Sequence, residues 1–355
     1  MLEKIDIAKG IKALVTFRPT FLFTLCTLAL CLMISIPWAF MFGTISIDPF
    51  QAINIVLSHI ISSDFFNAST SPGVQNIVWE LRVPRILMAC ITGAGLAVAG
   101  LTLQSITQNN LADPHLLGIS SGAVFGAVIT TLHLGDVLGE MTLPIMAFSG
   151  ALIATLFVVI VSHRSSAGSA TKLLMCGVAI SFVLMSAANF AMYLGDNRSG
   201  HQIVFWMLGG LGQTRWPHLL LPFTICALGY LFLAFNARNI NALLLGDETA
   251  TSMGLNVKTL RIQLFIISAL ITSILVANTG AIGFIGLMIP HVARFFVGHS
   301  VNRLLPICAI LGAGFLIWVD VLSRTVLSPE ELPIGIITGF IGGLFFIGLL
   351  IKSSD

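Results

Sequence analysis

Long apolar runs, separated by short polar segments, dominate the chain. Most runs approach the roughly 20 residues that a helix needs to cross a bilayer, and they lack the apolar–polar alternation of β-barrel strands. The pattern predicts an all-α integral membrane protein with about ten transmembrane helices. We expect the spans at about residues 21–42, 85–107, 120–134, 143–161, 173–194, 216–235, 260–277, 282–297, 304–321 and 334–351.

Two longer polar segments interrupt this series. Residues 43–80 precede the second span, and within them residues 49–59 are expected to form a short amphipathic helix. Residues 236–258 lie between the sixth and seventh spans, and we expect short helices there around Gly254. Asp247 and Glu248 would then lie near a helix N-terminus, where the helix dipole favours negative charge.

The composition supports a membrane protein. Of the 355 residues, 56% are hydrophobic and only 9% are charged, whereas soluble domains carry about 25% charged residues. The first run lacks an A-x-A cleavage site, so we expect a retained helix and not a signal peptide. The six cysteines lie in apolar segments without a CxxC pair and are expected to behave as small buried hydrophobes.

The positive charges predict the orientation. Cytoplasmic segments are enriched in Lys and Arg, and twelve of the seventeen basic residues fall on one side if the N-terminus is cytoplasmic. Both termini are therefore expected in the cytoplasm. The twelve are Lys4, Lys9, Lys12, Arg18, Arg164, Lys172, Arg238, Lys258, Arg261, Arg294, Arg303 and Lys352.

Residues 82–123 form the most distinctive stretch. It contains RVPR, then the pattern G-x-x-x-x-G-x-x-x-Q from Gly95 to Gln104 within an apolar run that stops at Gln108, then NNLADP and LLGISSGA. Two later blocks are GAIGFIGLMIPHVAR at residues 280–294 and residues 320–335, which end in ELPIG. In these motifs the chain resembles the permeases of ABC importers for iron–siderophore complexes, haem and cobalamin, from about residue 82 to the C-terminus. One departure is Asn110, where the family usually has proline; we expect it to change loop stiffness but not the fold.

The resemblance implies a type II ABC importer permease fold in one transmembrane domain over residues 1–355, in the bacterial inner membrane. Inverted repeats are common in transporters, and the halves would be about residues 1–200 and 201–355. The implied partners are two cytoplasmic ATPase subunits, a periplasmic substrate-binding protein, and a second copy or a sister permease. Nucleic acid is not an expected partner. The implied substrate is an iron–siderophore, with haem or cobalamin as the alternative.

Five arginines depart from the inside bias of positive charge, namely Arg82, Arg85, Arg198, Arg215 and Arg324, and three of them are candidates for function. Arg82 and Arg85 flank Pro84 at the outer start of the second span, and Arg324 lies at the outer end of the ninth. They could anchor the helices at the interface or dock an acidic patch of a soluble partner, since the guanidinium fork pairs with carboxylates. The resemblance favours docking, because it assigns matched arginines to glutamates of the binding protein.

The resemblance also assigns a role to the second polar segment, LGDETATSMGL at residues 245–255. It would be the coupling segment that fits a groove on the ATPase, where a rigid shape transmits ATP-driven closure. The residues expected to act there are Leu245, Gly246, Asp247, Glu248, Ala250, Met253, Gly254 and Leu255.

The translocation path is less clearly marked. Gly335, Gly339 and Gly343 share one face of the tenth span, a pattern typical of close helix packing or of a path lining. The fifth span presents Phe182, Met185, Asn189 and Met192 on one face. That stripe also fits plain packing, but the resemblance places the fifth and tenth spans beside the central path, with Asn189 as a polar group within the membrane.

Other classes of function find less support. None of the six lysines lies in a G-x-x-x-x-G-K-[ST] motif, the loop that binds nucleotide phosphates. ATP and Mg²⁺ are therefore expected on a separate subunit, and no cofactor is expected on this chain. An intramembrane enzyme would need a motif such as H-E-x-x-H, which does not occur, or G-x-S-x-G after a strand. The one G-x-S-x-G match, GISSG at residues 118–122, lies inside the LLGISSGA block between apolar runs and follows no expected strand. No His or Cys lies at metal-ligand spacing to another. An ion-coupled carrier needs ionisable groups inside spans, and Asp320, near an outer end, is the candidate.

Overall fold

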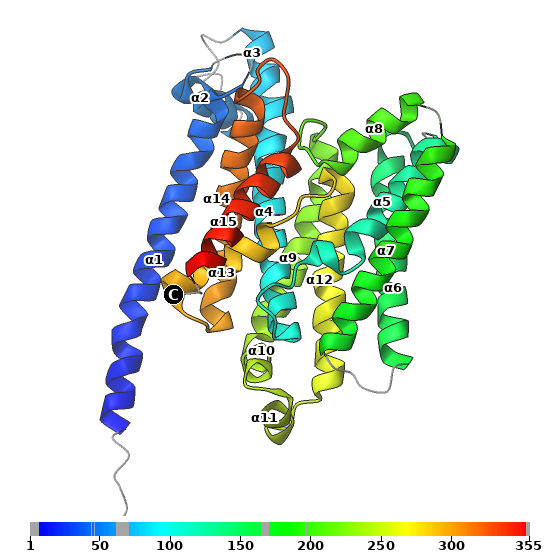
Figure 1. Ribbon diagram of the computed structural model, residues 1–355. Helices are drawn as coiled ribbons and strands as arrows, with labels where there is room; N and C mark the ends of the chain where they lie inside the picture. Colours follow the sequence, from blue (N-terminus) through cyan, green and yellow to red (C-terminus); the bar gives the residue numbers. More distant parts are fainter. Residues whose placement is uncertain are drawn as a thin grey trace, which may run out of the picture.

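The computed structural model describes residues 7–43, 45, 47–61, 71–135, 137–164, 170–195 and 197–352, and this part of the chain is helical without β-strands (Figure 1). Short 3-10 or π segments cover residues 77–82, 114–116, 130–134, 139–141 and 216–218. The α-helices are α1 (Ile7–Met41), α2 (Pro49–Ile61), α3 (Pro72–Asn76), α4 (Val83–Thr107), α5 (Ile119–Ile129), α6 (Thr142–Arg164), α7 (Ala170–Leu194), α8 (Asn197–Met207), α9 (Leu220–Phe235), α10 (Ala237–Leu244), α11 (Asp247–Ser252), α12 (Val257–Thr279), α13 (Ile285–Val297), α14 (Val301–Thr325) and α15 (Ile334–Lys352).

A helix occupies each of the ten expected spans, but within the described residues only eight helical segments are long and apolar enough to cross a membrane. The two exceptions are the third span, α5 with its π extension, and the eighth, α13. Each follows a non-helical stretch, at residues 108–113 and 280–284. The amphipathic helix expected at residues 49–59 is present as α2.

The most buried helix is α4, which lies at the centre of the bundle. It packs against α14, α12 and α13, and 78% of its 18 consecutive residues with the highest hydropathy are buried. Glycines allow this approach: a Cβ on Gly93 would lie 2.1 Å from the carbonyl oxygen of Gly312, and a Cβ on Gly100 would lie 2.0 Å from that of Gly286. Such backbone contact holds helices together in a membrane, where apolar side chains gain little by leaving lipid.

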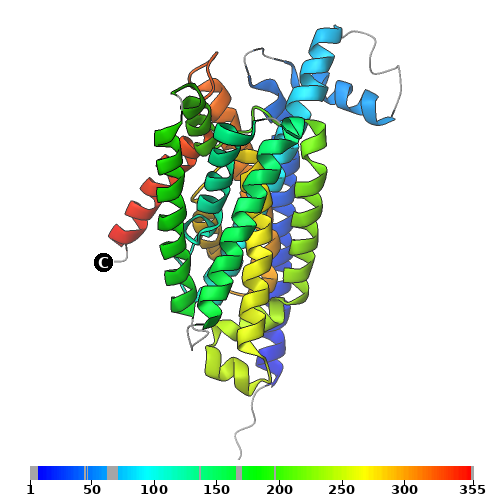
Figure 2. The same ribbon diagram turned by 90° about the vertical axis from the view of Figure 1, so that its right-hand side faces the viewer.

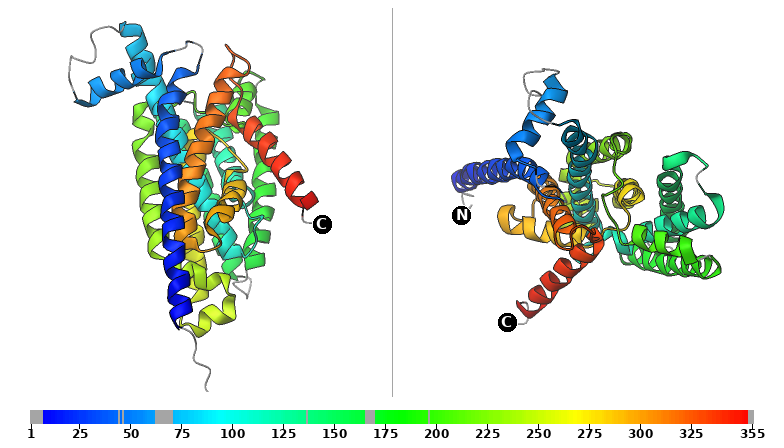
Figure 3. Two further views of the ribbon diagram at one scale, coloured as in Figure 1. Left: turned by 90° about the vertical axis from the view of Figure 1, so that its left-hand side faces the viewer. Right: turned by 90° about the horizontal axis from the view of Figure 1, so that it is seen from above.

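Three long helices lie at the periphery and are largely uncovered. Of the 18 consecutive residues with the highest hydropathy in each helix, 0% are buried in α1, 17% in α7 and 17% in α15. The helix α1 stands beside α14, and α15 slants outward from the bundle (Figure 3). A separate group of α5, α6 and α7 stands beside α12 (Figure 2).

The two ends of the bundle carry different elements. The helices α2, α3 and α8 lie at the end drawn uppermost in Figure 1, and we call this the outer end. The helices α10 and α11 lie at the opposite end, together with the start of α1, and we call this the inner end. The Pro–His pairs at residues 114–115 and 290–291, one in each expected half, have different settings: Pro114 opens a 3-10 segment in a loop, whereas Pro290 lies inside α13. The two-half division of the chain stays a prediction.

Candidate functional site

The outer end contains a buried cluster of basic side chains. Arg82 ends the π segment before α4, Arg85 lies in the first turn of α4, and Arg324 lies in the last turn of α14. These side chains come together because α4 and α14 are neighbours along their lengths. The three residues are 5%, 8% and 5% exposed, respectively.

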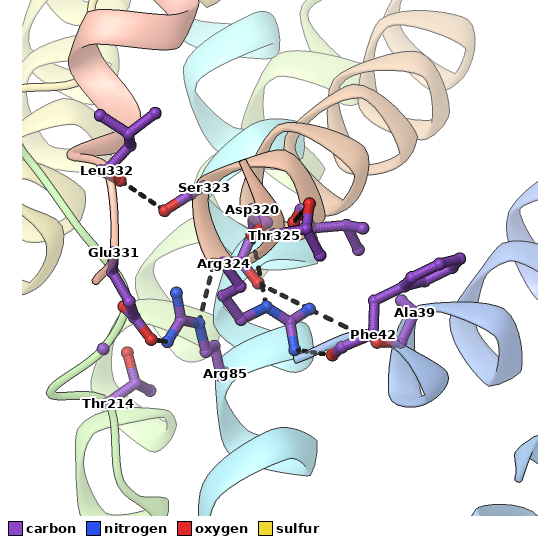
Figure 4. A network of polar contacts seen from close by, with 12 residues as sticks. Ala39, Phe42, Arg85, Thr214, Asp320, Ser323, Arg324, Thr325, Glu331 and Leu332 are labelled. Carbon is purple, nitrogen blue, oxygen red and sulfur yellow. Dashed lines mark hydrogen bonds and ion pairs between the residues drawn. The ribbon is translucent and has the colours of Figure 1, made fainter. Parts of the chain in front are cut away.

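Asp320 is the centre of this cluster (Figure 4). Its Oδ1 accepts from Arg85 Nε at 2.8 Å, and its Oδ2 pairs with Arg324 Nη2 at 3.1 Å. Arg85 Nη1 also pairs with Glu331 Oε1 at 2.7 Å. Asp320 is completely buried, whereas the Glu331 side chain is 46% exposed. The cluster thus holds one carboxylate between two guanidinium groups and a second carboxylate at its rim.

Backbone carbonyls from the end of α1 complete the cluster. Arg324 Nη1 donates to the carbonyl of Phe42 at 3.0 Å, and the Arg82 guanidinium donates to the carbonyls of Phe40 and Ile45. These bonds join α1 to α4 and α14. Arg85 and Arg324 are therefore paired with carboxylates of the same chain and Arg82 donates to backbone carbonyls, while Arg85 Nη2 stays buried without a hydrogen-bond partner among the described residues.

Arg82, Arg85 and Arg324 were expected at the outer end and lie there, but their side chains are buried and not presented at the surface of this chain. Both the docking role and the anchoring alternative stay predictions. The sequence alone did not identify Asp320 and Glu331 as the carboxylate partners of Arg85 and Arg324. The four-residue spacing of Asp320 and Arg324 on one helix was an available signal, but the pairing of Arg85 with Asp320 joins residues 235 positions apart.

At the inner end, α10 and α11 form the short helices predicted around residues 245–255. Asp247 and Glu248 occupy the first turn of α11, as expected from the sequence. Asp247 Oδ1 pairs with Arg261 Nη2 at 2.7 Å, and Arg261 Nε donates to the carbonyl of Ile106 at 3.0 Å. The segment is thereby tied both to α12 and to the end of α4.

The shape of this segment depends on two glycines and one buried residue. Gly246 and Gly254 have φ values of +104° and +86°, a region that other residues rarely adopt. Ala250 is buried between them, while Leu245 and Met253 are 66% and 63% exposed. The segment therefore holds two apolar side chains out from a fixed backbone, which suits contact with another protein.

The residues proposed for the path lie on uncovered helix faces. On α7, Phe182 and Asn189 are exposed, while Met185 and Met192 pack partly against Val124 and its neighbours on α5.

The glycines of α15 divide into two kinds. A Cβ on Gly335 would lie 2.3 Å from the carbonyl oxygen of Leu208, so this glycine serves packing within the chain. A Cβ on Gly339 or Gly343 would meet nothing within 4 Å. Close packing within this chain explains Gly335 but does not explain Gly339 and Gly343, whose Cβ positions have no neighbour within the described residues.

The loop at residues 108–118 meets the break before α13. The carboxylate of Asp113 accepts from the backbone N–H of His115 at 2.7 Å and from that of Phe284. Burial raises the pKa of Asp113 above its usual range, and the charge of His115 and these two N–H groups oppose the rise. Phe284 has φ +69°. Asp113 thus joins the two non-helical stretches. The break after residue 107 marked it in the sequence, but its partner was not predictable.

Among the described residues, no group of three or more His, Cys, Asp or Glu could hold a metal ion.

Comparison with known proteins gives a family match over nearly the whole chain. The model of the FecCD transport family matches residues 28–352. The ABC transporter permease YvrB of Bacillus subtilis is 39% identical over 291 residues, which are 80% of this chain and 81% of YvrB. The hemin transport system permease HmuU of Yersinia pestis is 36% identical over 297 residues, with coverages of 82% and 87%. The vitamin B12 import permease BtuC of Vibrio cholerae is 34% identical over 281 residues, with coverages of 79% and 84%.

A solved structure has the same fold. A proposed metal-chelate type ABC transporter, in an inward-facing conformation, superimposes with a TM-score of 0.80 at 28% identity. The match covers 93% of this chain and 99% of that one.

Proposed function

This chain belongs to the FecCD transport family, and from that premise we propose that it is the membrane subunit of an ATP-driven importer. In this proposal it receives an iron–siderophore or a similar metal chelate from a binding protein and passes it to the cytoplasm. The observation that carries the proposal is the family match over residues 28–352, which include the outer cluster, the inner segment and the open helix faces.

The inner segment supports the coupling role. Residues 245–255 present Leu245 and Met253 from a backbone that Arg261 and the two glycines hold in shape. ATPase subunits, with ATP and Mg²⁺, would bind there and move α12 and α4 through the Asp247–Arg261 pair and the bond from Arg261 to the carbonyl of Ile106. This chain would itself bind no nucleotide.

The open faces of α7 and α15 support a path shared with a second permease. Phe182 and Asn189 are exposed on one face, with Met185 and Met192 partly covered beside them, and Gly339 marks the other, next to the packed Gly335. A second copy or a sister permease placed against these faces would cover apolar residues that this chain leaves exposed, and the substrate would pass between the two subunits.

Docking of a binding protein on the outer end is proposed in a modified form. Because the three guanidinium groups are buried, a partner carboxylate could reach Arg85 most directly by replacing the half-exposed Glu331. Glu331→Gln would then raise the affinity for the binding protein, because it removes the internal competitor. Glu330→Gln is the matched control, an exposed acid one position away. Unchanged or weaker binding of Glu331→Gln would contradict docking at Arg85.

The substrate class rests on the relatives. HmuU is named as a hemin permease, BtuC as a vitamin B12 permease, and the solved neighbour as a metal-chelate type transporter. Haem or cobalamin is therefore the alternative to an iron–siderophore. An ion-coupled carrier is disfavoured, because Asp320 is already shared between Arg85 and Arg324.

The direct test is ATPase activity of the reconstituted complex in lipid, with the cognate ATPase and binding protein, while candidate chelates are titrated. We expect stimulation by one loaded binding protein, and the stimulating chelate identifies the substrate. If the chain forms no stable complex with any ATPase, the importer proposal fails.

A further inference from the structure

A half-open pocket of about 200 Å³ lies at the inner end, where α4 and α13 end and α14 begins. Its floor includes Gln104 and Ser105 of α4, which are almost completely buried. Its rim carries the exposed Gln108, Asn110 and His299. One water needs about 10–15 Å³ of such space, so the pocket has room for a polyatomic ligand. None of the residues that line it is acidic.

Arg294 brings a positive charge to this pocket. Its Nη2 donates to Gln104 Oε1 at 2.7 Å. The Gln104 amide nitrogen donates to the carbonyls of Gly286 and Leu287 at 3.1 and 3.3 Å, which turns Oε1 toward the guanidinium. Arg294 Nη1 is buried without a hydrogen-bond partner, and within the described part of the chain no carboxylate pairs with Arg294.

Arg294 is partly buried, and the absence of a carboxylate partner among the described residues is unusual for a guanidinium in such a setting, since buried charges in proteins are normally paired. The carbonyl end of α13 offers a partial negative charge, but the amino end of α14, which begins at Val301 in the same pocket, opposes it. A neutral amide is therefore the main partner of a full positive charge. A bound anion would supply the missing counter-charge.

We propose that this pocket binds a phosphate group. Guanidinium groups pair well with phosphate oxygens, and an anion of this size can accept several hydrogen bonds at once. Two further side chains are available at the rim, because Asn110 and His299 make no side-chain hydrogen bond within the described residues. The combination of one charged donor in the wall and neutral polar groups at the mouth suits a group that enters from the inner surface.

The pocket adjoins the segment proposed to couple to the ATPase. Leu244, the last residue of α10, lines it directly before residues 245–255. Gln108 Nε2 donates to the carbonyl of Leu243 at 2.8 Å and connects the rim to α10. A phosphate group held by Arg294 would therefore join α13 to the support of the coupling segment. This site lies beyond the proposed importer function and does not depend on the identity of the chelate.

Two sources could present this chemistry, a soluble phosphate and the headgroup of an anionic phospholipid. The first arm measures the thermal unfolding of the full chain in neutral detergent, in sodium phosphate against sodium chloride at equal ionic strength. The second compares nanodiscs of phosphatidylglycerol with nanodiscs of phosphatidylcholine. At ten times the dissociation constant we expect a rise in Tm of about 2 °C. A rise in the first arm with equal Tm in the two kinds of nanodisc identifies soluble phosphate, and a higher Tm in phosphatidylglycerol identifies the lipid headgroup.

Three variants make the result specific. Arg294→Gln removes the charge and keeps a donor for Gln104, and we expect binding about tenfold weaker or worse. Asn110→Trp fills the mouth without touching the Arg294–Gln104 contact, so it tests the site even if the first variant folds poorly. Lys258→Gln removes an exposed basic residue outside the pocket and should behave as the parent does. No rise in either arm, or an equal rise in Asn110→Trp, would overturn the proposal and leave the importer function untouched.

Discussion

The seam between α4 and α14 and the open faces of α7 and α15 contain similar kinds of residue in opposite settings. At the seam, Gly93 meets the backbone of Gly312, and the charges of Arg85 and Arg324 meet Asp320. On the open faces, a Cβ on Gly339 would meet nothing within 4 Å, and Asn189 is exposed and forms no side-chain hydrogen bond to another described residue. Residue type alone therefore does not show whether a residue of a membrane helix stabilises this chain or is available for contact with another chain.

The difference separates folding from assembly. Glycines and buried charges at the seam determine whether one chain is stable, because lipid offers no alternative partner. Residues on the open faces add little to that stability, so they are free to serve contacts with a second permease and with the substrate. Variants of the two regions should therefore give different signatures.

The largest effect is expected from Asp320→Asn at the seam. It leaves Arg85 and Arg324 without their shared carboxylate, and breaking such a buried pair costs about 3–5 kcal/mol of stability. Thermal unfolding of the purified chain should show a strongly lowered Tm or little folded protein. Glu331→Gln, at the half-exposed rim, should cost about 1 kcal/mol or less. Similar losses for both variants would contradict the central role of Asp320.

Glycine substitutions should sharpen the comparison directly. Gly93→Val puts a side chain against the Gly312 carbonyl, and overpacking of this kind costs about 1–3 kcal/mol. Gly339→Val has open space and should leave the Tm of the isolated chain unchanged. If α15 meets a second permease, Gly339→Val should instead lower transport or dimer formation, read by size-exclusion chromatography. Loss of Tm in Gly339→Val would show that its face is not open.

A smaller change in stability is expected at the inner segment. Asp247→Asn breaks the pair with Arg261, but Asp247 is half exposed, so the cost should stay near 1 kcal/mol or below. Substrate-stimulated ATPase activity should fall about two- to fivefold, the rate equivalent of about 0.5–1 kcal/mol. Glu248→Gln, which changes the adjacent acid that forms no ion pair within the described residues, is the control. An equal fall in both variants would point to general charge loss at the ATPase contact.

The smallest effect is expected from Asn189→Leu on the open face of α7. The Tm should stay within the equivalent of about 0.5 kcal/mol, as for surface substitutions away from specific contacts. Uptake into vesicles should change less than about threefold, because a path without a tight site does not depend on one amide. A loss of uptake above tenfold would instead mark Asn189 as a binding residue.

The course of the helices was predictable because hydropathy along the chain sets where a span can lie. The seventh expected span, residues 260–277, corresponds to α12 at Val257–Thr279. The depth of the eighth was less predictable, because the break at residues 280–284 shortens α13. Hydropathy indicates which residues favour the membrane but does not show where the helix starts inside it.

The surroundings of the site residues were not predictable in the same way. The sequence places Arg85 at the outer end of a span. Its burial depends on the ion pair with Asp320, which no local sequence pattern predicts. Gly335 and Gly339 have the same spacing signal, yet only Gly335 has a neighbour, the carbonyl of Leu208. The inner segment was the exception, because its two glycines and its acidic first turn are local features.

The long separation between Arg85 and Asp320 also sets a timetable for biosynthesis. These residues are 235 positions apart, and ribosomes add about 5–20 residues per second. For roughly 10 to 50 s the nascent chain therefore holds Arg85 before its carboxylate has been made. During that interval α1 and α4 have no α14 to join, so the insertion machinery or water at the membrane surface must accommodate the charge until the last helices arrive.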